Sequence, residues 1–412
     1  MIRPKQLDAF LRRSRLEPSV MDSALFIDEF VKDMRAGMNG SKSSLGMIPT
    51  YLSGDGPLAE NSMAVAIDAG GTNFRTALLR FDREGAHIEE YSAYPMPGTH
   101  GEVSWSEFIG FAANSVKPYL KYTDRLGFCI SFPIEITPEH DGFIHHTTKE
   151  VLINGYERRL VCSELRNVLD MPEIHTVLVN DTTAVLLSGL AAGVDSGGLV
   201  GLINGTGTNV CCQLPCRDMG LDLPGRMIVD VESGGFVPPE RGRFDLELDR
   251  NSSYPGVYLE EKMVSGAYLG ELSLLAMKAA ARDGIFSTEA AGAVLSMQRL
   301  ETPEADALGY FGHIDAIPDG PDAEFAREIV RAVFGRAAKH IACTLAAVAR
   351  TAGTDADGVL TVSADGSVFR KSHLFRPMLE KAAIQYVPAR EIRYIEMDDS
   401  TIIGTALCAL MT

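Results

Sequence analysis

A glycine-rich turn occurs twice in the sequence, each time between two apolar runs. The first copy, at residues 67–73, reads IDAGGTN, and the second, at residues 203–209, reads INGTGTN. A strand, a glycine-rich turn and a second strand predict a β-hairpin whose tip exposes backbone N–H groups and hydroxyls. Because glycine lets the backbone approach a ligand closely, such a tip can hold phosphate oxygens. Two hairpins about one domain's length apart predict a duplicated fold that binds one nucleotide between its halves.

The length and composition are those of a globular protein with more than one domain. The 412 residues can form two domains with proper cores, and 46% of them are hydrophobic while 23% are charged. The formal net charge of −17 argues against sequence-independent binding of nucleic acid, which needs a basic face. A phosphorylated ligand stays possible, because it needs only a local positive potential.

The cysteines and the apolar runs indicate the cellular compartment of the protein. Seven cysteines are present and none belongs to a Cys-x-x-Cys pair, so the sequence predicts neither a disulfide framework nor a zinc site. No apolar stretch approaches the length of about eighteen residues that a membrane span needs, and no signal peptide is recognisable. We therefore expect a cytoplasmic protein with no membrane partner.

Apolar patterns predict alternating strands and helices, which is an α/β organisation. Residues 4–36 are predicted to be helical, residues 37–62 to be a connector, and residues 236–256 to be a loop. The predicted strands are 63–67, 74–81, 126–132, 176–179, 199–203, 210–214 and 359–363. The predicted helices are 184–192, 264–279, 325–345 and 402–412. The strand at 359–363 runs into residues 364–367, a third candidate nucleotide turn.

Two common phosphate-binding motifs are absent from the sequence. Gly205-x-Gly207 lacks the third glycine of the dinucleotide fingerprint, since position 210 is valine, and it precedes a strand rather than a helix. No Gly-x-x-x-x-Gly-Lys-Ser/Thr segment occurs, which excludes a P-loop enzyme. What remains resembles the superfamily of sugar kinases, heat-shock ATPases and actin, whose duplicated domains each offer a β-hairpin to the nucleotide phosphates.

Further segments narrow this resemblance to the hexokinase family, in the form of a single-unit hexokinase or glucokinase. Residues 67–75 and 205–209 resemble its two phosphate motifs, and residues 364–369 resemble its adenosine motif. The remaining matches, in chain order, are 47–51 (MIPTY), 131–133 (SFP), 146–149 (HTTK), 179–182 (VNDT), 231–236 (VESGGF) and 255–271. Because the matches run in order from about residue 40 to the C-terminus, the likeness is specific.

The resemblance implies two α/β lobes of the ribonuclease-H-like, actin-like ATPase type with a ligand cleft between them. We expect a small lobe over residues 63–180 with the C-terminal helix 402–412, and a large lobe over residues 181–400 with the N-terminal segment 1–62. ATP and Mg²⁺ are the implied cofactors, and a hexose is the implied substrate. Sugar binding is expected to close the cleft and exclude water.

The resemblance implies catalysis by Asp181, together with Lys149 and Arg75. Phosphoryl transfer to a sugar hydroxyl needs one carboxylate to accept the hydroxyl proton, and Asp181 is the implied general base. Alternatively, Asp181 only caps the helix that follows it. Arg75 either supports the transferred phosphate or pairs with a carboxylate and braces its hairpin.

The implied nucleotide site lies on the three turns. Asp68 is expected to orient Mg²⁺ through water, because this ion keeps much of its hydration beside one or two carboxylates. The alternative is a turn aspartate that bonds to its own backbone. The implied nucleotide-binding residues are Asp68, Gly70, Gly71, Thr72, Asn73, Gly205, Thr206, Gly207, Thr208, Asp365, Gly366 and Ser367.

The implied sugar site is built mainly from polar side chains, which reject sugars that leave those groups unpaired. Its residues are Ser131, Phe132, Pro133, Thr148, Lys149, Asn180, Asp181, Asn209, Glu232 and Glu261. Ser233 stands where the family has an aromatic residue, so the preferred sugar stays open. His145 and His146 have no counterpart, and we expect them to be rim or core residues rather than metal ligands.

The sequence therefore predicts a glycolytic enzyme, an ATP:hexose 6-phosphotransferase, with glucose as the favoured sugar. Its predicted partners are the hexose and ATP, with no nucleic acid and no membrane, and the oligomeric state is left open. Two alternatives remain. One is a hexokinase-like sugar sensor with little turnover, and the other is a chaperone- or actin-like ATPase that switches conformation without sugar.

Overall fold

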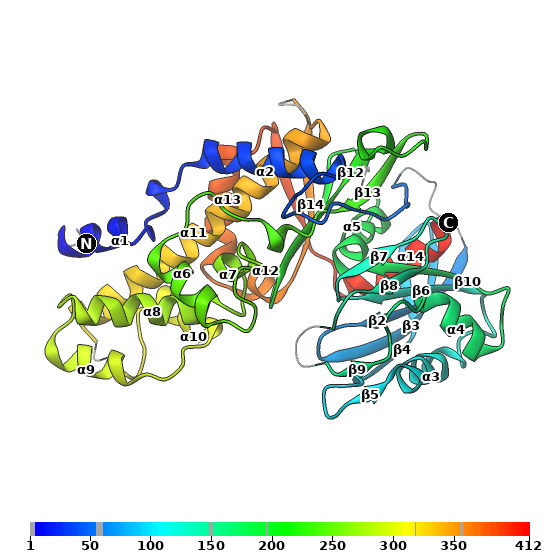
Figure 1. Ribbon diagram of the computed structural model, residues 1–412, viewed down its shortest axis with the longest axis horizontal. Helices are drawn as coiled ribbons and strands as arrows, with labels where there is room; N and C mark the ends of the chain where they lie inside the picture. Colours follow the sequence, from blue (N-terminus) through cyan, green and yellow to red (C-terminus); the bar gives the residue numbers. More distant parts are fainter. Residues whose placement is uncertain (1–4, 55–60, 148–150, 195–196, 318, 355–356) are drawn as a thin grey trace.

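The computed structural model describes residues 5–54, 61–147, 151–194, 197–317, 319–354 and 357–412. Two main sheets organise these residues, and helices cover both of them (Figure 1). Two short strand pairs, β5 (Val103–Ser104) with β9 (Ile153–Asn154) and β7 (Ile134–Ile136) with β8 (Gly142–Ile144), complete the strands of the described part.

The first main sheet has the strand order β10-β6-β2-β3-β4. Its strands are β2 (Ser62–Ala69), β3 (Asn73–Asp82), β4 (Gly85–Pro95), β6 (Arg125–Ile130) and β10 (His175–Asn180). Strands β2, β3 and β4 form an antiparallel meander. Strands β6 and β10 extend the sheet on the other side of β2 and run parallel to it.

The second main sheet repeats this arrangement in the order β1-β13-β12-β11-β14-β15. Its strands are β1 (Ile48–Pro49), β11 (Leu199–Asn204), β12 (Thr208–Pro215), β13 (Arg226–Asp230), β14 (Val359–Asp365) and β15 (Glu391–Ile395). Strands β11, β12 and β13 form the meander, and β14 and β15 extend the sheet in parallel to β11. The predicted duplicated α/β fold is confirmed. The residue limits of the two lobes stay a prediction.

The helices of the described part are distributed over both sheets. They are α1 (Lys5–Arg13), α2 (Ser23–Met38), α3 (Trp105–Val116), α4 (Val161–Leu169), α5 (Asp181–Ala191), α6 (Arg243–Asn251), α7 (Glu261–Val264), α8 (Leu269–Arg282), α9 (Thr288–Ser296), α10 (Thr302–Phe311), α11 (Pro321–Ala352), α12 (Ser367–Lys371), α13 (Phe375–Tyr386) and α14 (Ser400–Met411). Helices α3 and α4 lie beside the first sheet, whereas α1, α2 and α6–α13 form a large helical region beyond the second sheet (Figure 1).

Helices α5 and α14 pack against each other between the two sheets (Figure 1). Helix α14 contacts β2 and β6, while α5 contacts β11 and β14. Gly404 of α14 lies so close to α5 that an added Cβ would overlap the carbonyl oxygen of Ala184. A glycine is therefore required at this helix crossing, and the crossing fixes the two sheets relative to each other.

Alternate side chains of strand β2 pack into two different hydrophobic clusters. Val65 and Ile67 belong to the cluster that includes Phe108 of α3, whereas Ala64 and Ala66 belong to the cluster that includes residues of α14. Successive side chains of a strand point to opposite faces, so the large residues fill the wide α3 side. The small alanines let α14 approach closely on the other side.

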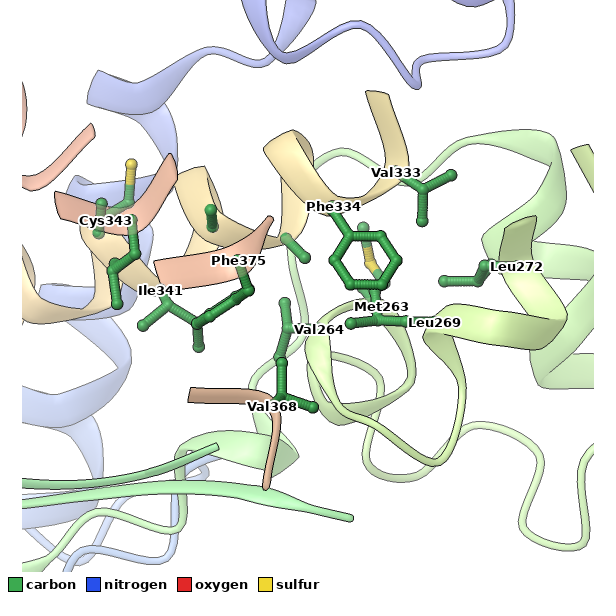
Figure 2. Close-up of a cluster of buried hydrophobic side chains, with 14 of the residues drawn as sticks. Met263, Val264, Leu269, Leu272, Val333, Phe334, Ile341, Cys343, Val368 and Phe375 are labelled. Atoms are coloured by element: carbon green, nitrogen blue, oxygen red, sulfur yellow. The ribbon is translucent and has the colours of Figure 1, made fainter. Parts of the chain in front are cut away.

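Helix α11 is the central helix of the large helical region and contacts α2, α8, α10 and α13. Within the described ranges it is the one helix whose length and composition would suit a membrane span, and 94% of its apolar window is buried inside the protein. Such burial is typical of a core helix. Figure 2 shows Phe334 of α11 beside Met263 of α7 and Leu269 of α8. This packing holds the start of α8 next to the second glycine-rich turn.

Several sequence predictions were wrong in detail. The predicted loop 236–256 contains α6, which is mostly polar and buries only a few residues such as Phe244 and Leu248 on one face. The predicted helix 264–279 is two helices, α7 and α8, because the backbone turns at Ser265. Strands β4 and β15 were missed because their side chains are largely exposed or half-buried and lack an apolar alternation.

Candidate active site

The turn between β2 and β3 is the first predicted phosphate site. The backbone N–H of Gly70 donates to the carbonyl oxygen of Asn73 (3.0 Å), which closes the turn. Asp68, at the end of β2, is 1% exposed and forms an ion pair with Arg75 of β3. Thr401 of α14 donates its hydroxyl hydrogen to the same carboxylate oxygen, Oδ2 (2.8 Å). Arg75 thus braces the hairpin, which is one of the two roles that the sequence left open.

The turn between β11 and β12 is the second predicted phosphate site, and it rests on the segment between α7 and α8. The N–H of Gly205 donates to the carbonyl oxygen of Gly207 (2.9 Å) across the turn. The N–H of Gly266 donates to the carbonyl oxygen of Gly205 (2.7 Å), and the N–H of Ala267 donates to that of Thr206 (3.2 Å). Backbone hydrogen bonds from the protein itself therefore hold the conformation of this turn.

Glu261 supports the same turn from the first residue of α7. Its Oε2 accepts a hydrogen bond from the backbone N–H of Thr208 (3.1 Å). An added Cβ on Gly207 would lie 2.5 Å from this oxygen, so the carboxylate packs directly on the glycine. The sequence assigned Glu261 to the sugar site, and the structure places it where the sugar site and the second turn would meet.

The third turn, at Asp365–Ser367, lies against the second. Gly366 has a φ of +105°, and an added Cβ would overlap the backbone of Asn204. Asp365 accepts a hydrogen bond from the hydroxyl of Ser400, which precedes Thr401 in the first turn of α14. Helix α14 therefore contacts both the first and the third turn through two adjacent hydroxyls. All three predicted nucleotide turns converge on one region.

The tips of both hairpins are open to a ligand. The side chains of Thr72, Asn73 and Thr206 are exposed, and Gly71 and Gly207 are half-buried. The residues just behind the tips are buried, so the exposed groups sit on a rigid base. Such an arrangement of glycines and hydroxyls on a fixed turn suits the oxygens of a phosphate chain.

Asp181 is the first residue of α5, directly after β10. Asn180 caps this helix, since its Oδ1 accepts a hydrogen bond from the N–H of Thr182 (2.8 Å). The alternative that Asp181 is merely the helix cap is therefore wrong. Burial raises the pKa of Cys129 in the neighbouring strand β6, and the charges of Asp68 and Asp181 raise it further. Both carboxylates thus act on the same buried thiol, which places Asp181 near the first hairpin.

Four carboxyl groups interact with one another beside the second sheet, those of Asp181, Asp230, Glu232 and Glu261. Burial, together with the charge of Asp181, raises the pKa of Asp230, at the end of β13, to about 7. Burial also raises the pKa of Glu232 well above its usual range, with further contributions from Asp230, Asp181 and Glu261. A neighbouring positive charge would stabilise the ionised form of these carboxyl groups. The negative charges of the neighbouring carboxylates instead favour the protonated form. The cluster is therefore a site that a polyhydroxylated ligand could satisfy by donating hydrogen bonds.

Asn209 and Asp230 form a buried hydrogen-bonded pair. The Nδ2 amide of Asn209 donates to Oδ1 of Asp230 (2.6 Å), and its Oδ1 accepts from the N–H of Ser233 (3.1 Å). Glu232, between Asp230 and Ser233 in sequence, has a φ of +55°, which is uncommon for a residue with a Cβ. The hydrogen bonds of Asn209 to Asp230 and to Ser233 hold the chain on both sides of Glu232. An uncommon backbone conformation that is held in this way points to a functional constraint.

The predicted sugar loop lies next to the first hairpin. The N–H of Ser131 donates to the carbonyl oxygen of Ala69 (3.2 Å). Phe132 is 1% exposed and packs in the core, so only its backbone could face a ligand. Pro133 accepts a hydrogen bond from the N–H of His145 (3.0 Å). The predicted residues Thr148 and Lys149 lie outside the described residues.

Sequence reasoning missed several groups that the structure brings to this region. Asp230 was missed because the strand that it ends, β13, was not predicted. Ser400 and Thr401 were given no role, and the predicted helix began after them, at residue 402, whereas α14 begins at Ser400. A cavity of about 450 Å³, lined by Gly266, Ala267, Gly270, Lys278, Arg299 and Thr302 among others, borders the second turn. No continuous motif encodes this cavity. Among the described residues, no group of three or more His, Cys, Asp or Glu could hold a metal ion.

Comparison with known families agrees with this arrangement. A family model described as Hexokinase matches residues 199–411, more than half of the chain, and a second model with the same description matches residues 6–191. The chain belongs to the hexokinase family. Hexokinase-2 from Homo sapiens is 29% identical over 444 residues, and Hexokinase-1 from Rattus norvegicus is 26% identical over 442 residues. Each alignment covers 98% of this chain and 48% of the relative, so the chain spans about half the length of these hexokinases.

Solved hexokinase structures share the fold of this chain. A hexokinase from Schistosoma mansoni in complex with glucose has a TM-score of 0.80 at 24% identity, and the match covers 98% of both chains. A second hexokinase crystal structure has a TM-score of 0.81 at 22% identity and covers 98% of this chain and 99% of that one. At these identities the likeness shows the two-lobed hexokinase fold.

Proposed function

We propose that this hexokinase-family chain transfers the γ-phosphoryl group of ATP to the 6-hydroxyl of a hexose, with Asp181 as general base. The observation that carries this proposal is the position of Asp181. It is the first residue of α5, directly after a strand of the first sheet, and Asn180 is the N-cap of this helix. Its charge raises the pKa of Cys129, as does that of Asp68 of the first hairpin, and it also raises the pKa values of Asp230 and Glu232 beside the second sheet. A carboxylate at this position could serve both the proposed phosphate site and the proposed sugar site.

The proposed step moves one proton and one phosphoryl group. Asp181 accepts the proton of the 6-hydroxyl while the hydroxyl oxygen forms a bond to the γ-phosphorus and the bond from that phosphorus to the β,γ-bridging oxygen breaks. ADP then leaves, and the proton passes from Asp181 to solvent. A positioned base typically contributes a rate factor of about 10² to 10⁴. The protein otherwise supplies positioning and charge stabilisation.

The nucleotide is proposed to lie along the three turns, with its phosphates at the tips of the two hairpins and its nucleoside toward the cavity beside Gly266. Asp68 fits Mg²⁺ only as a water-mediated partner, because one of its oxygens already bonds both Arg75 and Thr401. The ion that accompanies ATP would neutralise phosphate charge there. Lys149 is proposed to act beside Asp181, although it lies outside the described residues.

The sugar is proposed to bind at the carboxylate cluster with Asn180 and Asn209. Hydroxyls of a hexose can donate to Glu232 and Glu261, whose mutual repulsion such donors relieve. Glucose is the favoured hexose, and the hexokinase from Schistosoma mansoni that shares this fold is named as a glucose complex. We also propose a cytoplasmic, glycolytic role, which the seven buried and unpaired cysteines, all within the described residues, support.

The test is release of ADP from ATP and Mg²⁺ in the presence of glucose, mannose, fructose, glucosamine, N-acetylglucosamine or no sugar. Turnover that requires a hexose is the expected result. Hydrolysis of ATP that is indifferent to sugar would instead identify a conformational ATPase. Sugar binding by calorimetry without turnover would identify a sensor.

A further inference from the structure

One contact near the proposed sugar site is not used by the proposed reaction. The Nε2 atom of His146 and the hydroxyl of Tyr258 lie 2.9 Å apart, at hydrogen-bond distance, although 112 residues separate them in sequence. His146 follows β8, and Tyr258 precedes α7. Both side chains are half-buried. The contact therefore joins two segments that come from different parts of the chain.

Tyr258 lies at the carboxylate cluster. Burial, together with the negative charges of Glu232 and Glu261, raises the pKa of Tyr258 to about 12, so the phenol is close enough to interact with both of these proposed sugar ligands. Its φ of +54° is a left-handed conformation that aromatic residues rarely adopt. Its carbonyl oxygen accepts a hydrogen bond from the N–H of Lys262 (3.1 Å) in α7. The backbone thus holds the tyrosine in an uncommon orientation beside the pocket.

His146 is carried by the segment that forms the sugar loop. Strands β7 and β8 pair antiparallel directly after the loop, with Ile134 opposite Ile144. The neighbouring residue, His145, donates its N–H to Pro133 of the loop (3.0 Å). On the other side of the contact, the N–H of Glu260 donates to the carbonyl oxygen of Phe236 (3.1 Å), which ties the tyrosine segment to the turn that follows Glu232. The His146–Tyr258 contact therefore bridges the sugar loop and the carboxylate cluster.

We propose that Tyr258, held in place by His146, is a specificity-determining residue of the hexose site. This inference rests on the proposed hexose phosphorylation. A ring that is fixed at both its backbone and its hydroxyl forms a rigid wall, and it presents an apolar face to the C–H groups of a sugar. A rigid wall excludes a sugar with a bulky substituent, because the ring cannot move aside without losing the bond to His146.

The first test removes the bond and keeps the ring. Tyr258→Phe and His146→Ala are each expected to raise the KM for glucose by about two- to tenfold, the usual value of one hydrogen bond, with kcat changed less than twofold. The double variant is expected to match either single variant, because both remove the same contact. Tyr254→Phe and His145→Ala are the matched controls, since both residues are exposed neighbours, and they should behave as wild type.

The second test removes the wall. Tyr258→Ala is expected to raise kcat/KM for N-acetylglucosamine relative to glucose by at least about tenfold, because the acetyl group gains room. Thermal unfolding of each variant checks that the fold is intact. Effects that add up in the double variant, or an unchanged N-acetylglucosamine to glucose ratio in Tyr258→Ala, would overturn the proposal.

The two proposals fail in different ways. If the wild-type protein shows no hexose-dependent release of ADP, hexose phosphorylation is wrong, and the same variants are then compared by their Kd for glucose in calorimetry. A two- to tenfold weaker Kd in both single variants, without further weakening in the double variant, still supports the tyrosine wall. Wild-type turnover with variants that match the controls refutes the wall alone.

Discussion

Thr401 donates its hydroxyl hydrogen to the buried carboxylate of Asp68 (2.8 Å) although 333 residues separate the two in sequence. The next residue toward the N-terminus, Ser400, bonds Asp365 of the third turn in the same way. The first turn of α14 therefore joins the first hairpin to the third turn. Helix α14 also packs on α5, the helix that begins with Asp181, so one helix contacts the first turn, the third turn and the helix of the proposed general base.

Removing the hydroxyl of Thr401 is expected to loosen the first hairpin. Thr401→Val keeps the shape of the side chain but leaves Asp68 with one donor fewer, so the KM for ATP should rise by about two- to tenfold. Thr401→Ser retains the hydroxyl and should restore the wild-type value. Steady-state kinetics at saturating glucose measure the effect. An unchanged KM for ATP in Thr401→Val would contradict this role of α14.

The crossing of α5 and α14 is expected to tolerate no side chain at Gly404. Gly404→Ala places a Cβ against the carbonyl oxygen of Ala184 and should lower the free energy of unfolding by about 1–3 kcal/mol or more. Gly292→Ala is the matched control, because Gly292 lies inside α9 with open space around it. That substitution should leave stability unchanged or raise it by up to about 1 kcal/mol. Urea unfolding compares the two, and equal effects would refute the close crossing.

Asp230 is expected to make stability depend on pH between about 4 and 7. Its pKa is raised from 3.8 to about 7 in the folded state, so the folded state binds more protons than the unfolded state in this range. The stability that protonation of Asp230 contributes should therefore fall as pH rises from about 4 to 7 and level off above 7, by up to a few kcal/mol. Asp230→Asn keeps an acceptor for Asn209 and removes the titration. Urea unfolding at pH 5 and pH 8 should show a smaller difference in Asp230→Asn than in wild type, and an identical difference would contradict the assignment.

Breaking the buried ion pair between Arg336 of α11 and Asp245 of α6 is expected to cost far more folding free energy than breaking an exposed pair. Two hydrogen bonds join the guanidinium and the carboxylate (2.6 and 2.8 Å), and both side chains are nearly inaccessible. Arg336→Met leaves a buried charge without its partner and should cost about 3–5 kcal/mol of folding free energy. Arg350→Ala breaks the exposed pair with Asp28 and should cost less than about 1 kcal/mol. Chemical denaturation measures the free energy of unfolding of both variants, and a similar loss in Arg336→Met and Arg350→Ala would contradict this prediction.

The sequence was most informative where function depends on local chain geometry. The glycine-rich turns at Gly70 and Gly205 predicted both hairpins, because a tight turn between apolar runs is encoded by neighbouring residues. The polar junction after the strand at 176–179 predicted a helix for the same reason, although α5 begins at Asp181 rather than at the predicted residue 184. The family to which the chain belongs was also predicted from these segments.

The rest depended on contacts between distant segments, which no local pattern encodes. Thr401 meets Asp68, Asn209 meets Asp230, and Tyr258 meets His146 only after the sheets and helices have packed. Helix α6 was missed because most of its residues are polar or charged and only a few apolar residues lie on its buried face. The strand β4 was missed because its side chains are mainly exposed. These elements follow from tertiary packing rather than from residue type.

The measurement that tests the account most directly compares wild type with Asp181→Ala, with Asp124→Ala as an exposed control. Glucose-dependent release of ADP and the Kd for glucose are measured on the same three proteins. We predict that Asp181→Ala lowers the rate by about 10² to 10⁴ while glucose still binds, and that Asp124→Ala matches wild type. A rate within a few-fold of wild type in Asp181→Ala would show that this carboxylate is not the general base, and the proposed mechanism would be wrong.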